Sequence, residues 1–204
     1  RDSANAQALQ QYDLLSVTPT TETAFQHACI TLSELKPFSI DIISLDLAAA
    51  PRLPFYLKRS TVGAALANGV VFEITYGAAV ANTQDTPDVS AARRNLFAGA
   101  RDLLRATNGK GVIISSSALD ALGVRAPYDV MNLAALMGMT PNAAKDAIST
   151  TCQSLVIRAE TRQTFRGTIS KPYVLPGEHK PALGMDESTK RRAKRKLSND
   201  DECT

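Results

Sequence analysis

Short apolar runs alternate with longer amphipathic stretches from the start of the chain to about residue 160. Four apolar runs are bounded by turn-forming residues and predict buried strands, at residues 12–17, 40–45, 70–76 and 111–115. The other stretches repeat apolar residues every three or four positions and predict helices, at 22–35, from Ser60 or Thr61 to Asn68, and at 88–105, 127–137 and 141–157. The predicted chain alternates strands with helices and ends in a pair of helices.

This alternation predicts an α/β fold with a parallel sheet and right-handed crossovers. Two architectures satisfy it. One is a doubly wound sheet, and the other is half of an eight-stranded βα barrel. Four strand–helix units cannot close such a barrel, because the full architecture takes about 250 residues. The pattern alone leaves both architectures open.

Charge and composition divide the chain into two parts. Of its 204 residues, 44% are hydrophobic, which is enough to bury a core. Residues 1–170 carry 15 Lys/Arg against 14 Asp/Glu, so any affinity for nucleic acid must come from local patches. Residues 171–204 carry 8 against 6 and show no periodicity, which predicts one domain over 1–170 and a disordered basic and acidic tail over 171–204.

Cysteine usage and hydropathy bear on the compartment. The three cysteines are widely spaced and fit neither a disulfide framework nor a metal knuckle, which favours a reducing, intracellular setting. No apolar run approaches the length that crosses a bilayer, so we expect no membrane partner.

Residues that could support catalysis are sparse. The chain has two histidines, His27 inside a predicted helix and His179 in the tail, whereas a metal-dependent phosphoesterase needs several His, Asp and Glu side chains at strand ends. Ser115 and Ser116 follow a strand without a nucleophile elbow, and Cys152 lies among apolar helical neighbours. We therefore predict no catalytic residue and no metal site.

Basic and hydroxyl side chains near predicted loops are the better signal. Loops that follow parallel strands gather at one edge of a sheet, where guanidinium and hydroxyl groups suit phosphate oxygens and an exposed tyrosine suits an unpaired base. We expect Lys58, Arg59 and Arg125 to converge there with the two serines. Arg158, Arg162 and Arg166 recur at four-residue spacing, on one side of a helix if helix continues there. The candidate RNA-binding residues are Tyr56, Lys58, Arg59, Ser115, Ser116, Arg125, Arg158 and Arg162. The alternative is a solvated surface with scattered ion pairs.

Several of these segments together resemble one family. They are Y-D-L-L-S-V-T-P at 12–19, R-L-P-F-Y-L-K-R at 52–59, G-V-V-F-E-I at 69–74, G-K-G-V-I-I-S-S at 109–116 and the whole of 125–169. In order and spacing they resemble the 30 kDa protein subunit family of ribonuclease P and ribonuclease MRP, over roughly residues 10–170. Residues 77–92 depart most from the family.

The resemblance implies a TIM-type barrel, similar to the polymerase-and-histidinol-phosphatase barrels, of which this chain carries the C-terminal half. It implies a non-catalytic subunit of a ribonucleoprotein in which the RNA, with bound Mg²⁺, matures the 5′ ends of precursor tRNA or processes precursor rRNA. The chain itself is then expected to bind no cofactor. Implied partners are the ribonuclease P or MRP RNA and other protein subunits, including a small α/β subunit, with precursor tRNA contacted indirectly.

Two rival functions remain possible on sequence grounds. A metal-dependent phosphoesterase of the related barrel superfamily would need ligands that an absent N-terminal half would have to supply. A small-molecule barrel enzyme would need a phosphate-binding glycine loop, which the sequence lacks. The chain opens on Arg1 rather than Met, so we expect it to be a piece of a longer protein.

The tail contains a dense basic run. Six basic side chains occupy seven positions: Lys190, Arg191, Arg192, Lys194, Arg195 and Lys196. Such a run repels itself and stays extended, which suits an import receptor and predicts location in the nucleus. Within the nucleus we expect the protein in the nucleolus. Contact with RNA, or a solubilising tail with no receptor, are the alternatives.

Overall fold

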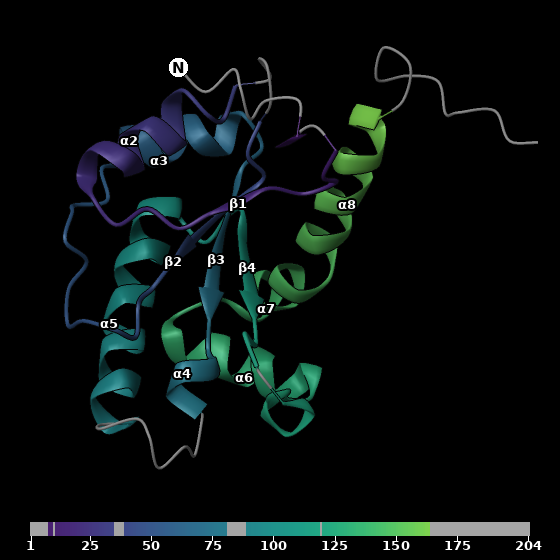
Figure 1. Cartoon of the computed structure of the whole chain (residues 1–204). Coiled ribbons are helices and arrows are strands. Elements are labelled where there is room, and N and C mark those ends of the chain that lie inside the picture. Colours follow the sequence, from purple (N-terminus) through teal and green to yellow (C-terminus); the bar gives the residue numbers. More distant parts are fainter. Residues whose placement is uncertain (1–7, 10, 35–38, 81–88, 119, 164–204) are drawn as a thin grey trace, which may run out of the picture. The chain divides into compact units, whose positions relative to one another are not determined.

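A sheet of four parallel strands forms the centre of the structure, a computed structural model of the chain (Figure 1). The strands are β1 (Ser16–Val17), β2 (Ile42–Leu45), β3 (Val71–Thr75) and β4 (Val112–Ser115). The structure describes residues 8–9, 11–34, 39–80, 89–118 and 120–163, all within the first of two units, Arg1–Ile169. The predicted tail, its basic run and Arg166 lie outside the described residues.

The strands lie in sequence order, β1-β2-β3-β4, without a reversal. A doubly wound sheet reverses its order where its two halves meet. Successive right-handed crossovers in one direction instead place the connecting helices on one face, as in a barrel. The strand order therefore agrees with the barrel-like alternative, although the described strands form an open sheet and not a closed barrel.

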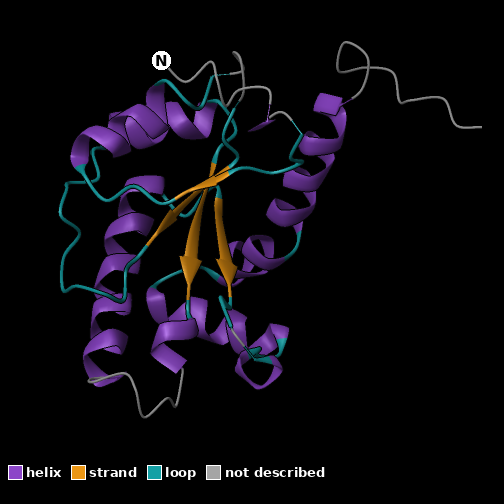
Figure 2. Cartoon of the chain, in the orientation of Figure 1, coloured by secondary structure: helices purple, strands orange, loops and turns teal. Residues whose placement is uncertain are grey.

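One face of the sheet packs on helices α2 (Glu22–Ile30), α3 (Arg59–Ala67) and α5 (Val89–Thr107), as Figure 2 shows. Side chains alternate along a strand, so residues in register, such as Ile43, Phe72 and Val112, point to the same face. All three are buried in the main core. Their helical partners in that core are Phe25, Ala28, Val62, Ala65, Leu96, Ala100 and Leu103.

The opposite face is covered in part by α8 (Thr150–Gln163), which follows α6 (Pro127–Met137) and α7 (Pro141–Ile148) (Figure 1). Val71 of β3 and Ile113 of β4 point to this face and form a second buried cluster with Leu155 of α8. The sheet is thus apolar on both faces where strands begin. On this second face its later positions are polar, with Glu73 beside Ser44 and Thr75 beside Ser115.

Helix boundaries follow the local signals where these are strong. The predicted helix 127–137 is confirmed, because Pro127 stands in its first turn and Gly138, at φ 106°, adopts the left-handed conformation that ends it. The predicted helix 141–157 is wrong in one respect, since it breaks at Ser149 into α7 and α8. The Ser149 hydroxyl donates to the Lys145 carbonyl at 2.6 Å, and such side-chain bonds compete with helical ones.

Other boundaries differ more modestly. The helix expected at 22–35 ends at Ile30, and the helix expected from Ser60 or Thr61 begins at Arg59. The segment after β3, for which the pattern predicted neither strand nor helix, contains the short helix α4 (Gly77–Val80). A 3-10 turn, η1 (Ala121–Gly123), precedes α6.

The first strand is much shorter than residues 12–17. The Leu15 amide donates to a carboxylate oxygen of Asp41 at 3.0 Å rather than to a strand carbonyl. A side chain thus takes the place of a ladder partner, and only Ser16 and Val17 pair with β2.

Candidate nucleic-acid interface

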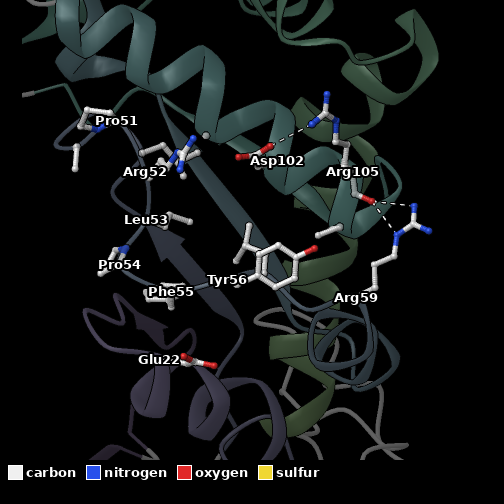
Figure 3. A pocket seen from close by; sticks show the side chains of 15 residues that line it. Glu22, Pro51, Arg52, Leu53, Pro54, Phe55, Tyr56, Arg59, Asp102 and Arg105 are labelled. Atoms are coloured by element: carbon white, nitrogen blue, oxygen red, sulfur yellow. Dashed lines mark hydrogen bonds and ion pairs between the residues drawn. The ribbon is translucent and has the colours of Figure 1, made fainter.

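A groove of about 570 Å³ lies between the segment 46–58 and helix α5 (Figure 3). We call it the Tyr56 groove, after the aromatic side chain that stands in it. Pro51 and Pro54 keep the segment out of a helix, because proline lacks the amide hydrogen. The segment passes from the Ala48 carbonyl, bound by Asn95 at 3.1 Å, to Arg59, which contacts Arg105. It therefore follows α5 from the edge where strands end toward the edge where they begin.

Tyr56 is exposed between two buried neighbours. Phe55 is 7% exposed and stacks on Phe25 of α2, with ring centroids 4.8 Å apart, and Leu57 is also buried. Tyr56 stands between these two buried residues and is itself 77% exposed. An exposed tyrosine ring on a fixed backbone suits stacking on a base.

Arg59 is held in place by a neutral partner. Its Nε and Nη2 both donate to the Arg105 carbonyl oxygen, at 3.2 and 3.1 Å. Arg105 lies in the last turn of α5, where carbonyls lack helical partners and attract cations. The guanidinium is thus oriented, while its charge is not cancelled by a carboxylate among the described residues.

The other charges of the groove are partly paired. Lys58 Nζ lies 3.2 Å from Glu22 Oε1, and Arg105 Nη1 lies 3.4 Å from Asp102 Oδ1. Arg52 also lines the groove and has no ion-pair partner among the residues that the structure describes. Among the described residues, Arg52 and Arg59 are therefore the two cations around Tyr56 without a carboxylate partner.

Ser115, Ser116 and Arg125 form a separate group at the edge where β3 and β4 end. The Ser115 hydroxyl donates to Glu73 Oε1 at 2.6 Å, and the Arg125 amide donates to the Tyr76 hydroxyl at 3.1 Å. Ser116 and Arg125 line one cavity of about 220 Å³. The expected convergence with Lys58 and Arg59 does not form, because the segment 46–58 carries those residues away along α5.

Arg158 and Arg162 contact the chain itself, near the opposite edge of the sheet. The four-residue spacing does place both on one side of a helix, α8, and that side faces the sheet. Arg162 Nη2 lies 2.8 Å from Asp41 Oδ2, and Asp41 is fully buried. Arg158 Nη2 donates to the Asn68 carbonyl at 2.5 Å. Their donors hold α8 to the sheet.

Three groove residues escaped the sequence interpretation, namely Arg52, Asp102 and Arg105. Arg52 had a signal, since it opens the R-L-P-F-Y-L-K-R run that holds Tyr56. The other two come from the C-terminal part of α5, where Arg105 lies 46 residues beyond Arg59 in the sequence, and only the fold brings them near. Asp41 also had a signal, because an acidic residue inside an apolar strand needs a buried partner.

Within the described ranges, no group of three His, Cys, Asp or Glu side chains gathers in a way that could hold a metal ion. His27 is exposed on α2, and Cys29 is fully buried. Burial raises the pKa of the Cys29 thiol to about 12, so the thiolate that a nucleophile needs is disfavoured. Nor does any described helix combine the length and the apolar character needed to cross a membrane.

Comparison with known proteins identifies the family. The sequence pattern described as RNase P subunit p30 matches residues 2–164. The Mus musculus protein named ribonuclease P protein subunit p30 is 36% identical over 188 residues, which cover 91% of this chain and 62% of the relative. The Schizosaccharomyces pombe protein named probable ribonuclease P protein subunit 3 is 32% identical over 162 residues, or 79% of this chain and 63% of the relative.

A third relative is named for both ribonuclease P and ribonuclease MRP. The Saccharomyces cerevisiae protein named ribonuclease P/MRP protein subunit RPP1 is 26% identical over 153 residues, covering 75% of this chain and 47% of the relative. The chain spans about three fifths of the mouse and S. pombe proteins. Since the family pattern covers most of the described fold, the chain belongs to the RNase P subunit p30 family.

Proposed function

We propose that this chain is part of a non-catalytic protein subunit of ribonuclease P, and of the related ribonuclease MRP particle. The observation that carries the proposal is the family match over residues 2–164, together with the names of the relatives. The RNA component supplies the phosphodiester chemistry with its own Mg²⁺, in 5′ maturation of precursor tRNA and in precursor rRNA processing. The protein braces that RNA.

Within the described part of the chain, no observation favours the phosphoesterase alternative. A two-metal or single-metal hydrolase would place several carboxylates or histidines at the edge where strands end. In the described part of that edge, Glu73 accepts from Ser115, and Asp46 accepts from the Ala49 amide at 3.1 Å. Both carboxylates serve local structure.

The fold of the longer protein is proposed to be a closed βα barrel. Supporting this, the four strands lie in unreversed order, and β1 and β4 each have one neighbour among the described strands. The second face of the sheet carries polar residues beyond the part that α8 covers. Further strands pairing with both edges would bury that face as a barrel interior.

The remaining partners and the location are also proposals. The subunit joins the ribonuclease P or MRP RNA and other protein subunits, among them a small α/β subunit, and meets precursor tRNA through the particle. The basic run at 190–196 directs the protein to the nucleus and nucleolus.

Affinity purification of the tagged full-length protein tests the proposal. We expect a structured RNA to co-purify together with an activity that cleaves precursor tRNA at the 5′ end of the mature sequence. A preparation that contains neither the RNA nor the activity, at low salt and with the protein intact, would refute it.

A further inference from the structure

We propose that the Tyr56 groove holds an unpaired nucleotide of RNA, with the Tyr56 ring stacked on its base and Arg52 and Arg59 on its flanking phosphates. The inference rests on the proposed function and narrows it to one site. In the view of Figure 3, the Tyr56 ring lies between the Arg52 and Arg59 side chains. Among the described residues, the two carboxylates of the groove, Glu22 and Asp102, pair with Lys58 and Arg105 and not with Arg52 or Arg59.

Charge favours a polyanion over a neutral ligand. Lys58 and Arg105 are neutralised by Glu22 and Asp102, which leaves the charges of Arg52 and Arg59 uncompensated among the described residues. Arg59 is oriented before any ligand arrives, because two of its donors are fixed on the Arg105 carbonyl. A fixed guanidinium loses little conformational entropy on binding phosphate.

The aromatic ring favours RNA with unpaired bases over a duplex. Bases inside a helix are stacked on one another and offer no free face to a side chain, whereas loops and bulges do. Tyr56 is 77% exposed, and the neighbouring Phe55 anchors the backbone by stacking on Phe25. Stacking tolerates any base, so the groove recognises an unpaired nucleotide and not a sequence.

The groove has a defined floor. Leu47 packs against Gly99 of α5, where an added Cβ would lie 3.0 Å from Leu47 Cδ2. Glycine at this position lets the segment 46–58 approach the helix closely. The volume between segment and helix, about 570 Å³, is large enough for one nucleotide.

The test compares matched variants of the full-length protein, using RNA extracted from the purified particle. Tyr56→Leu removes the aromatic ring, and its control Tyr56→Phe keeps the ring. Arg52→Gln removes one charge of the groove. Its control, Lys145→Gln, removes an exposed charge on α7 that does not line the groove. Tyr56→Leu is expected to weaken binding about fivefold to a hundredfold, the range that one stacked base supports, while Tyr56→Phe binds like the wild type. Arg52→Gln is expected to flatten the salt dependence by about 0.7 in log–log slope, the value for one single-strand phosphate, and Lys145→Gln to leave it unchanged.

Ultraviolet cross-linking of the intact particle provides a second readout. We expect a cross-link from Tyr56 to one nucleotide that is unpaired in the RNA. If both Tyr56→Leu and Arg52→Gln bind RNA with the affinity and the salt slope of the wild type, the inference is overturned and the proposed function still stands. If particles that carry these variants keep their RNA but lose one protein subunit, the groove is a protein-docking surface, and the inference is also overturned. Failure of the wild-type protein to bring any RNA from the cell would instead refute the proposed function.

Discussion

Two arginines of this chain, Arg59 and Arg162, differ in the groups to which they donate hydrogen bonds. Arg59 donates to a neutral carbonyl and keeps its charge available, whereas Arg162 donates to the buried carboxylate of Asp41 at 2.8 Å. Arg162 also donates to the Ser39 hydroxyl at 2.6 Å and to the Asp13 carbonyl at 2.9 Å. The sequence shows both as basic residues near helix ends. Only the fold shows that, among the described residues, Arg162 pairs with a carboxylate and Arg59 does not.

Arg162→Met is expected to destabilise the fold. It leaves the Asp41 carboxylate buried without its cation, which costs about 3 kcal/mol, at the low end for a broken buried pair because Arg162 is partly exposed. Urea unfolding of the full-length protein measures the loss, and adding Asp41→Asn should recover part of it. Arg101→Met, at an exposed position on α5, is the control and should change stability little. Equal stability of Arg162→Met and the wild type would contradict the structural role.

Cys29 makes stability depend on pH in the alkaline range. Burial raises the pKa of its thiol from 9.0 to about 12. Above about pH 9 the unfolded thiol loses its proton while the folded one keeps it, so the folded state binds more protons and the free energy of unfolding falls as pH rises toward 12. Urea unfolding at about pH 8 and about pH 10.5 measures this decline. It should be smaller in Cys29→Ala, and an identical decline in both proteins would show that Cys29 does not cause it.

Elements with strong local signals match their sequence predictions, whereas other boundaries follow individual side-chain hydrogen bonds, near or distant in the sequence. Pro127 and Gly138 fix the ends of α6, which appears as predicted. The shortness of β1 depends on Asp41, and the break before α8 depends on the Ser149 hydroxyl. Both effects come from single side-chain hydrogen bonds, and the periodicity of apolar residues in the sequence does not predict such bonds.

The candidate site shows the same limit. The sequence indicated Tyr56, Lys58 and Arg59 as candidate RNA-binding residues near a predicted loop. It could not show that Lys58 pairs with Glu22, 36 residues away, nor that the segment carries Arg59 along α5 and away from Arg125. Both facts depend on how two elements pack, which local pattern does not encode.

Gly69→Ala tests the packing of α8 on the sheet. Gly69 has φ +78°, and an added Cβ would collide with the Arg158 guanidinium, so the variant must strain the backbone and displace Arg158. We expect a loss of at least about 1 kcal/mol in the free energy of unfolding. Gly63→Ala is the matched control, because it lies inside α3 with open space around its Cβ and should gain up to about 1 kcal/mol. Equal effects from the two substitutions would contradict the placement of α8.

At the scale of the whole molecule, the open sheet predicts a dependence on the rest of the protein. Among the described strands β1 and β4 each pair on one side, and unpaired strand edges promote association between chains. We expect these 204 residues alone to aggregate or unfold without cooperativity, and a protein of the relatives' length to unfold cooperatively. Light scattering and thermal unfolding distinguish the outcomes. Reversible, sharp unfolding of the short chain as a monomer would contradict the barrel proposal.

We propose that the protein supports catalysis by an RNA and performs none itself. The most direct measurement is the cleavage of precursor tRNA by the purified particle before and after its RNA is removed with a nuclease that is then inactivated. The account predicts that activity disappears with the RNA and returns when intact RNA is added back to the proteins. Metal-dependent cleavage at the correct 5′ site by the RNA-free protein would contradict it.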